Sequence, residues 1–233
     1  MIASVHVADI GVRSALALAV VRKPPQPGSI GGLRQANMGL AAPLGASLLP
    51  RPDLGRVALV AFWDDDAALD RFLADHPLAA RLRGGWHVRL DPLRAWGSWP
   101  GLPDDLTLSR TVDHDGPAAV LTLGRLRVSQ ARRFLRTSAQ AEGRAVTAPG
   151  LAWASGFARP PFVATCSLWE TTEALSAYAY GPHEPAHPDA IAADRAEPFH
   201  HQEAFVRFRP YAAEGHLDGR NPLTETWPAP APA

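Results

Sequence analysis

The sequence predicts an α+β fold in which two ferredoxin-like βαββαβ units form one pseudo-twofold barrel of the dimeric α+β type. The first observation is an internal repeat: Trp63 recurs as Trp169 at an offset of 106 residues, and Arg89 recurs as Arg207 at an offset of 118. The second observation is that both halves show the same succession of strand-like and helix-like patterns.

Each half is expected to contain strand, helix, strand, strand, helix and strand, in that order. In the first half these elements fall at 3–10, 12–22, 32–43, 57–63, 64–73 and 86–90, and in the second half at 118–126, 129–142, 150–161, 162–169, 171–178 and 204–209. Ser129 is the expected N-cap of its helix and Gly143 the expected stop, while Asp64 and Thr171 are expected to cap the later helices.

Two such units bury their bare sheet faces against each other, with the helices outside and an interior cavity as the natural site. The predicted halves are residues 1–115 and 116–220, and the second is expected to bind the cofactor. Residues 221–233 are rich in proline and alanine, so they are expected to form a disordered tail.

Composition excludes several classes of protein. The 23 basic residues balance 23 acidic ones without a charge block, which argues against a nucleic-acid partner. The single cysteine, Cys166, lies in an apolar run and is expected to be a buried, inert thiol. No apolar run is long enough for a membrane span and no signal-peptide pattern is present, so the expected location is cytoplasmic. Motifs of hydrolases and phosphate loops are also missing from the sequence.

Three stretches carry a resemblance to a known family: "RPD" at 51–53, "WGSWPG" at 96–101, and the run 187–208. In this order they resemble the spheroidene monooxygenase family of acyclic-carotenoid ketolases, over roughly residues 30 to 210. The resemblance implies one b-type haem and oxygen as oxidant. The strands at 32–43 and 150–166 depart from the family's polar residues, and because they are expected to face the cavity, the substrate stays open.

His187 is the candidate iron ligand that follows from this resemblance, since neutral imidazole is a standard ligand of haem iron. Pro188 suits the first position of a helix on which Ile191 would lie beside the porphyrin and Arg195 would reach a propionate. Without the resemblance, the spacing of these residues favours an exposed helix start over an iron ligand. His183 is the competing ligand, although Pro185 breaks helical continuity between the two histidines.

Trp96 and Trp99 are candidate walls for the haem, with closure of the barrel over apolar neighbours as the structural alternative. Arg34 is the candidate catalytic residue on the distal side, because it is the one charge in its apolar strand; a solvent-facing position is the alternative. The acidic run 64–66 suits a helix start, where free amides stabilise carboxylates, better than a metal site.

Two classes of function follow. In the first, the chain is a haem-dependent, monooxygenase-like enzyme for an apolar or secondary metabolite, with oxygen or peroxide as co-substrate and a reductant protein as candidate partner. A variant of it keeps the haem but dehydrates a nitrogen–oxygen substrate. In the second, the barrel is a cofactor-free protein that binds a hydrophobic ligand. A homo-oligomer is a candidate assembly for either class.

Overall fold

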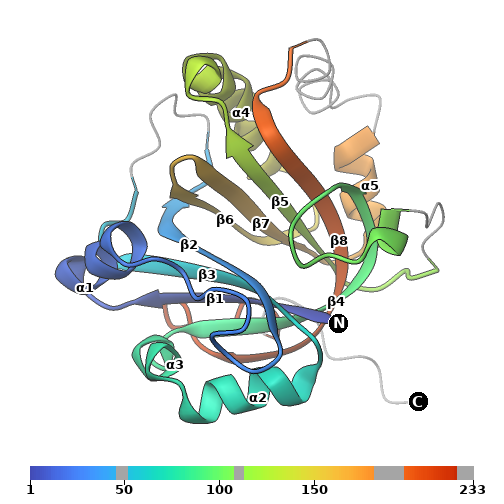
Figure 1. The fold of residues 1–233 in the computed structure, drawn as a ribbon. Helices are drawn as coiled ribbons and strands as arrows, with labels where there is room; N and C mark the ends of the chain where they lie inside the picture. Colours follow the sequence, from blue (N-terminus) through green and yellow to red (C-terminus); the bar gives the residue numbers. More distant parts are fainter. Residues whose placement is uncertain (46–51, 108–112, 181–196, 225–233) are drawn as a thin grey trace.

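A computed structural model describes residues 1–45, 52–107, 113–180 and 197–224 (Figure 1). The first half contains β1 (Ile2–Asp9), α1 (Val12–Leu16), β2 (Leu33–Pro43), β3 (Arg56–Trp63), α2 (Asp66–Asp75), α3 (Pro77–Leu82) and β4 (Trp86–Gly97). The second half contains β5 (Ala118–Leu126), α4 (Ala131–Ala145), β6 (Leu151–Arg159), β7 (Phe162–Trp169), α5 (Thr172–Tyr180) and β8 (His200–Gly215).

The strands close into one antiparallel barrel in the order β1-β3-β2-β6-β7-β5-β8-β4. The four strands of the first half lie in the order β4-β1-β3-β2, and those of the second half lie in the order β8-β5-β7-β6. The two halves therefore have the same internal strand order. Figure 1 shows α2 and α3 beneath the strands of the first half, and α4 and α5 beside the strands of the second. The predicted fold class is therefore confirmed.

The two repeated tryptophans occupy equivalent places. Trp63 and Trp169 are both buried. Trp63 lies opposite the first residues of β1 and β2, and Trp169 lies opposite the first residues of β5 and β6. Trp63 packs on Phe72 of α2 with ring centroids 5.0 Å apart, and Trp169 packs on Tyr178 of α5 at 5.1 Å. Both pairs join a strand end to the helix that follows it, as the repeat predicts.

The interior of the barrel is a packed core. Side chains that alternate inward from all eight strands form one apolar cluster, which includes Val5, Val60, Val88, Leu121, Cys166, Val206 and Phe208. Cys166 is buried, as expected, and burial raises the pKa of its thiol. The expected interior cavity is wrong for this part of the barrel, because apolar side chains fill the space that it would need.

The helix boundaries differ from the sequence prediction in detail. The side chain of Asp65, rather than Asp64, caps α2 by accepting from the amide of Ala68 at 2.8 Å. Helix α4 begins two residues after Ser129 and continues past Gly143, since a single glycine inside a helix costs only about 1 kcal/mol. Within the described ranges, no helix has both the length and the apolar character needed to cross a membrane.

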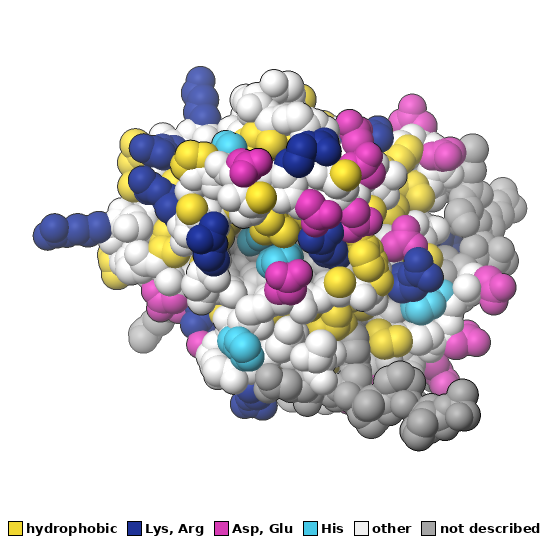
Figure 2. All heavy atoms as spheres, turned by 90° about the horizontal axis from the view of Figure 1, so that it is seen from below, with side chains coloured by type: hydrophobic (Ala, Val, Ile, Leu, Met, Phe, Trp, Pro, Cys, Tyr) yellow, Lys and Arg dark blue, Asp and Glu magenta, His cyan; other side chains and the backbone are white. Residues whose placement is uncertain are grey.

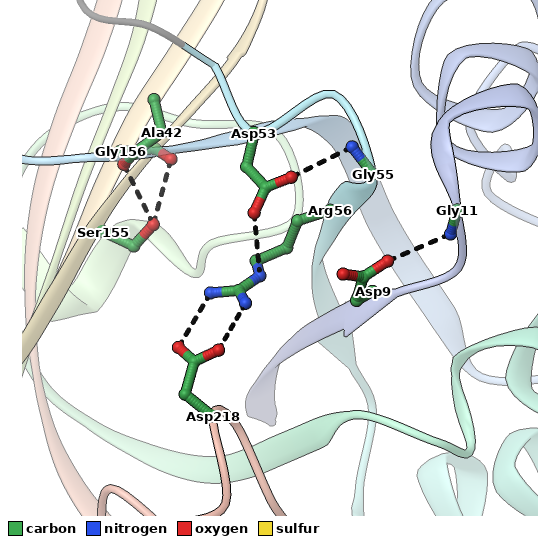
Figure 3. A network of polar contacts seen from close by, with 9 residues as sticks. All are labelled: Asp9, Gly11, Ala42, Asp53, Gly55, Arg56, Ser155, Gly156 and Asp218. Atoms are coloured by element: carbon green, nitrogen blue, oxygen red, sulfur yellow. Dashed lines mark hydrogen bonds and ion pairs between the residues drawn. The ribbon is translucent and has the colours of Figure 1, made fainter.

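Ion pairs and hydrogen bonds fix the strand ends at which the two halves join (Figure 3). Arg56 at the start of β3 donates to both carboxylate oxygens of Asp218, at 3.0 and 2.6 Å, and lies 3.5 Å from Asp53. The hydroxyl of Ser155 on β6 donates to the carbonyl of Ala42 on β2 at 3.2 Å. Asp53 of the "RPD" stretch is thus part of this structural network, whereas Arg51 lies outside the described residues.

The predicted disordered tail, residues 221–233, begins too early. Asn221 and Leu223 are buried, and the side-chain oxygen of Asn221 accepts from the indole nitrogen of Trp86 at 3.1 Å. Residues 221–224 therefore close one end of the first half, while 225–233 lie outside the described residues. The division of the chain near residue 115 remains a prediction; β5 begins at Ala118.

The equivalence of the tryptophans makes a prediction about stability. Trp63→Ala should lower the free energy of unfolding by about 3–5 kcal/mol, because a fully buried indole leaves a large cavity. Trp169→Ala should cost less, since the cluster around Trp169 is much smaller. Urea denaturation of both variants measures the difference. An equal or larger loss for Trp169→Ala would contradict this account of the packing.

Candidate functional site

The outer face of the second-half strands is the most open sheet surface that the structure describes. Its outward side chains come from β5, β6 and β7, with an edge on β4 and β8. We call it the open face, and it consists of Val120, Thr122, Gly124, Ala154, Gly156, Ala158, Val163, Thr165 and Ser167, with Arg94, Trp96, Glu203, Phe205 and Arg207 at the edge. Most of these residues are partly exposed, although few of them carry a charge.

Strand register arranges the open face in straight rows. In one row Trp96 lies opposite Phe205, Phe205 opposite Thr122, Thr122 opposite Thr165, and Thr165 opposite Gly156. Adjacent strands are about 4.8 Å apart, so this row is roughly 19 Å long. It begins with two aromatic rings, whose centroids are 5.5 Å apart, and ends with small side chains. The row is long enough to accept a planar ring system.

In the first half, two places of this row hold large apolar side chains, and the next two hold a pair of stacked histidines. Met38 and Leu59 occupy the places that Gly156 and Thr165 occupy in the second half, and both are almost completely buried, at 2% and 1% exposure. Helix packing on a sheet needs such side chains to fill the space between the two layers. Their loss in the second half leaves less side-chain volume over the strands.

The helices of the second half cover this face sparsely. Only Ala139 and Ala145 are buried in the 15-residue helix α4, and the apolar cluster beneath α5 contains just three buried residues. In the first half, by contrast, α1 and the π-helical turn Ala17–Val21 bury Ala15 and Leu18 in a large cluster. The open face is therefore a sheet surface that its own helices do not fully bury.

A histidine–carboxylate pair lies at the upper edge of the open face. The ring of His200 lies against Gly124, where a Cβ would come within 2.5 Å of it, and its Nδ1 is 2.9 Å from Oε2 of Glu203. Phe134 of α4 meets the same ring edge-on at 5.3 Å. A carboxylate that holds one ring nitrogen fixes the orientation of the imidazole, as is common for metal-bound and proton-transferring histidines. His200 is not among the site residues that the sequence predicts.

A second titratable group borders the open face on helix α4. One carboxylate oxygen of Glu142 accepts from the amide of Gly45 at 3.4 Å, next to Leu44, whose side chain lies 3.3 Å from the position of a Cβ on Gly156. Burial raises the pKa of Glu142 to about 7, and the hydrogen bond from Gly45 opposes the shift. A carboxyl group with this pKa can accept or release a proton near neutral pH.

The structure separates the residues that were expected to form the site. Trp96 lies on the open face and is half exposed, but Trp99 is buried in the barrel core against Phe162, with the guanidinium of Arg125 over its ring at 5.3 Å. Trp99 thus fits the structural alternative of closing the barrel. Arg34 sits at a β-bulge of β2 in the first half, 3.8 Å from Asp64, and is not part of the open face.

The predicted iron ligands and their neighbours cannot be placed in the same way. His183, His187, Ile191 and Arg195 lie outside the described residues. The elements on either side of them, α5 and β8, both border the open face. In the described part of the chain, no three histidine, cysteine, aspartate or glutamate side chains come together as a metal site. A surface depression of about 540 Å³ runs along α4, but none of its lining residues belongs to the open face.

Comparison with known proteins gives the family. Spheroidene monooxygenase of Rubrivivax gelatinosus is 35% identical over 176 residues, which cover 73% of this chain and 66% of that protein. The chain belongs to the spheroidene monooxygenase family. The spheroidene monooxygenases of Cereibacter sphaeroides and Rhodobacter capsulatus are each 27% identical, over 81% and 77% of this chain. The chain spans about two thirds of the length of the first two relatives, 66% and 62%.

Other comparisons add little to this result. No family model matches the chain. Among solved structures, an aldoxime dehydratase in complex with butyraldoxime is 8% identical with a TM-score of 0.49, covering 90% of this chain and 79% of its own. A heme-degrading enzyme from Listeria monocytogenes is 11% identical with a TM-score of 0.29, covering 88% and 99%. Likenesses this distant carry no argument about function.

The raised pKa of Glu142 predicts how stability depends on pH. The folded protein holds this proton up to about pH 7, whereas the unfolded chain releases it near pH 4.5, so stability should fall as pH rises through that interval. Glu142→Gln removes this dependence while it keeps a side-chain oxygen for Gly45. The melting temperature of the variant should therefore exceed that of the unchanged protein at about pH 8 but not at about pH 4. Equal differences at both pH values would contradict the assignment.

Proposed function

We propose that this chain is a haem-dependent oxidative enzyme, monooxygenase-like in its chemistry, that acts on an apolar metabolite. One b-type haem per chain would lie on the open face of the second half. The observation that carries this proposal is the paired loss of bulk at Gly156 and Thr165, where the first half has Met38 and Leu59. Family membership supports the oxidative class of reaction.

The residues of the open face fit a porphyrin in kind and in arrangement. A row of small and β-branched side chains can contact one face of the ring system, and Trp96 and Phe205 can pack at its edge. His187 is the proposed iron ligand in preference to His183, with Ile191 and Arg195 as its proposed neighbours. When bound, haem would supply the activation of oxygen or peroxide.

The protein residues near this face would control water and protons. A ligand bound on this face would exclude water from β5 and β7, which would lower the local dielectric and strengthen polar interactions. The Glu142 carboxyl, with its pKa of about 7, would hold or release a proton at its Oε atoms. Glu203 would keep the His200 ring in one orientation. Oxygen or peroxide, a reductant protein and an elongated apolar substrate complete the proposed set of partners.

Hemin titration of the purified protein tests the cofactor and its ligand together. The unchanged protein and His183→Ala should bind one hemin per chain with a Soret band and a ferrous–CO spectrum. His187→Ala should lose most of its bound haem, because the imidazole that holds the iron is gone. Circular dichroism of each variant controls for folding.

The other outcomes discriminate between the alternatives. Loss of haem in His183→Ala with retention in His187→Ala would reverse the ligand assignment. Retention in both variants would disprove both candidates and make His200→Ala the next variant to measure. A protein that takes up no hemin at all would contradict the proposed function, and the cofactor-free binding of a hydrophobic ligand would take its place.

A further inference from the structure

The internal repeat places one arginine at the same position in each half. Arg89 on β4 lies opposite Ser4 of β1, and Arg207 on β8 lies opposite Val120 of β5. Both side chains emerge on the outer face of the barrel. Arg89 contacts α2, the helix that follows Trp63, and Arg207 is close enough to Tyr180 at the end of α5 for an electrostatic effect. Because the two arginines have the same strand register, the first half serves as an internal control for what an arginine at this position binds.

In the first half the helix supplies two carboxylates. Nη1 of Arg89 donates to Oδ1 of Asp66 at 2.7 Å, and Nη2 donates to Oδ1 of Asp70 at 2.5 Å. Tyr211 also donates to Asp66, at 2.7 Å. Figure 2 shows this face, on which acidic side chains gather around basic ones over α2 and α3. The guanidinium of Arg89 is therefore fully matched by carboxylates of its own chain, and its pKa is raised.

In the second half both carboxylates are missing. Helix α5 carries Thr172 and Ser176 at the places of Asp66 and Asp70. Their hydroxyls donate to backbone carbonyls, Thr172 to Gly116 at 3.4 Å and Ser176 to Thr172 at 2.8 Å, so neither is directed to an arginine. The second half therefore has the arginine at the repeated position but lacks the two carboxylates that neutralise its counterpart in the first half.

Arg207 consequently has no carboxylate partner in the part of the chain that the structure describes. Its strand neighbour on the same face is another arginine, Arg94. Burial lowers the pKa of Arg207; Tyr180 opposes this shift, and the charge of Arg94 adds a smaller lowering. A half-buried guanidinium beside a like charge is costly unless an anion joins it.

We propose that Arg207 binds a carboxylate of the ligand on the open face, in the role that Asp66 and Asp70 fill for Arg89. This inference rests on the proposed function, in which the ligand is haem and the carboxylates are its propionates. Arg207 lies beside the row that runs from Trp96 to Gly156, because it is two residues beyond Phe205 on the same side of β8. A guanidinium suits a carboxylate through two parallel hydrogen bonds.

The test compares hemin with hemin dimethyl ester, whose propionates are uncharged. Arg207→Gln should bind hemin about tenfold more weakly than the unchanged protein, and should bind the diester equally well. Arg209→Gln is the matched control, since Arg209 lies two residues further along β8 and pairs with Asp91 at 2.7 Å. It should bind both compounds as the unchanged protein does.

Ser176→Asp is the reciprocal variant, because it restores the carboxylate that Asp70 provides in the first half. It should raise the melting temperature of the ligand-free protein and weaken hemin binding, since the new carboxylate occupies Arg207. Ligand-free Arg207→Gln should melt no lower than the unchanged protein. A clear loss of its stability would show that the chain itself supplies the partner, and would overturn the inference.

The outcomes separate this inference from the proposed function. If the unchanged protein binds hemin and Arg207→Gln binds it equally tightly, the role of Arg207 is wrong and the haem proposal stands. If Arg207→Gln loses hemin and the diester to the same extent, the arginine does not act on the carboxylates and the inference fails again. If the unchanged protein takes up no hemin, the proposed function itself is contradicted.

Discussion

An apolar sheet face in water must be covered, and this constraint organises the whole molecule. Closing eight strands into a barrel covers the inner faces of both halves with one shared core. It leaves two outer faces, one in each half. In the first half, large side chains such as Met38 and Leu59 pack against helices and satisfy the constraint within the chain. In the second half the matching places are taken by the smaller Gly156 and Thr165, and we propose that a ligand completes the covering.

The internal duplication makes these differences interpretable. A partly exposed Thr165, or an Arg207 without a carboxylate partner among the described residues, would say little in a single domain, because surfaces contain many such residues. Here each has a counterpart at the same register position, Leu59 and Arg89, with its packing or its ion pairs intact. The second half has kept the backbone and the arginine while it has lost bulk and carboxylates. Both losses are on one face, so one planar, anionic and largely apolar ligand accounts for both.

Much of the fold could be predicted from the sequence, because the repeat offsets and the strand and helix periods agree for all eight strands and for helices α1, α2, α4 and α5. The short helix α3 was not expected. The expected interior cavity was wrong, since inward positions such as Leu121 and Val206 alternate with outward ones and fill the barrel. The histidine pairs could not be predicted. His6 stacks on His87 at 5.0 Å and His200 meets Glu203 within one strand, and both contacts depend on register and side-chain direction that spacing does not reveal.

The central claim is that haem lies on the outer face of the second half rather than inside the barrel or on the first half. Paramagnetic broadening of amide signals in the hemin-loaded protein tests it most directly, because ferric iron broadens nearby resonances. The account predicts that the amides of Thr165 and Gly156 broaden on loading, while those of their counterparts Leu59 and Met38 stay sharp. Broadening of Leu59 and Met38 with sharp signals from Thr165 and Gly156 would contradict it.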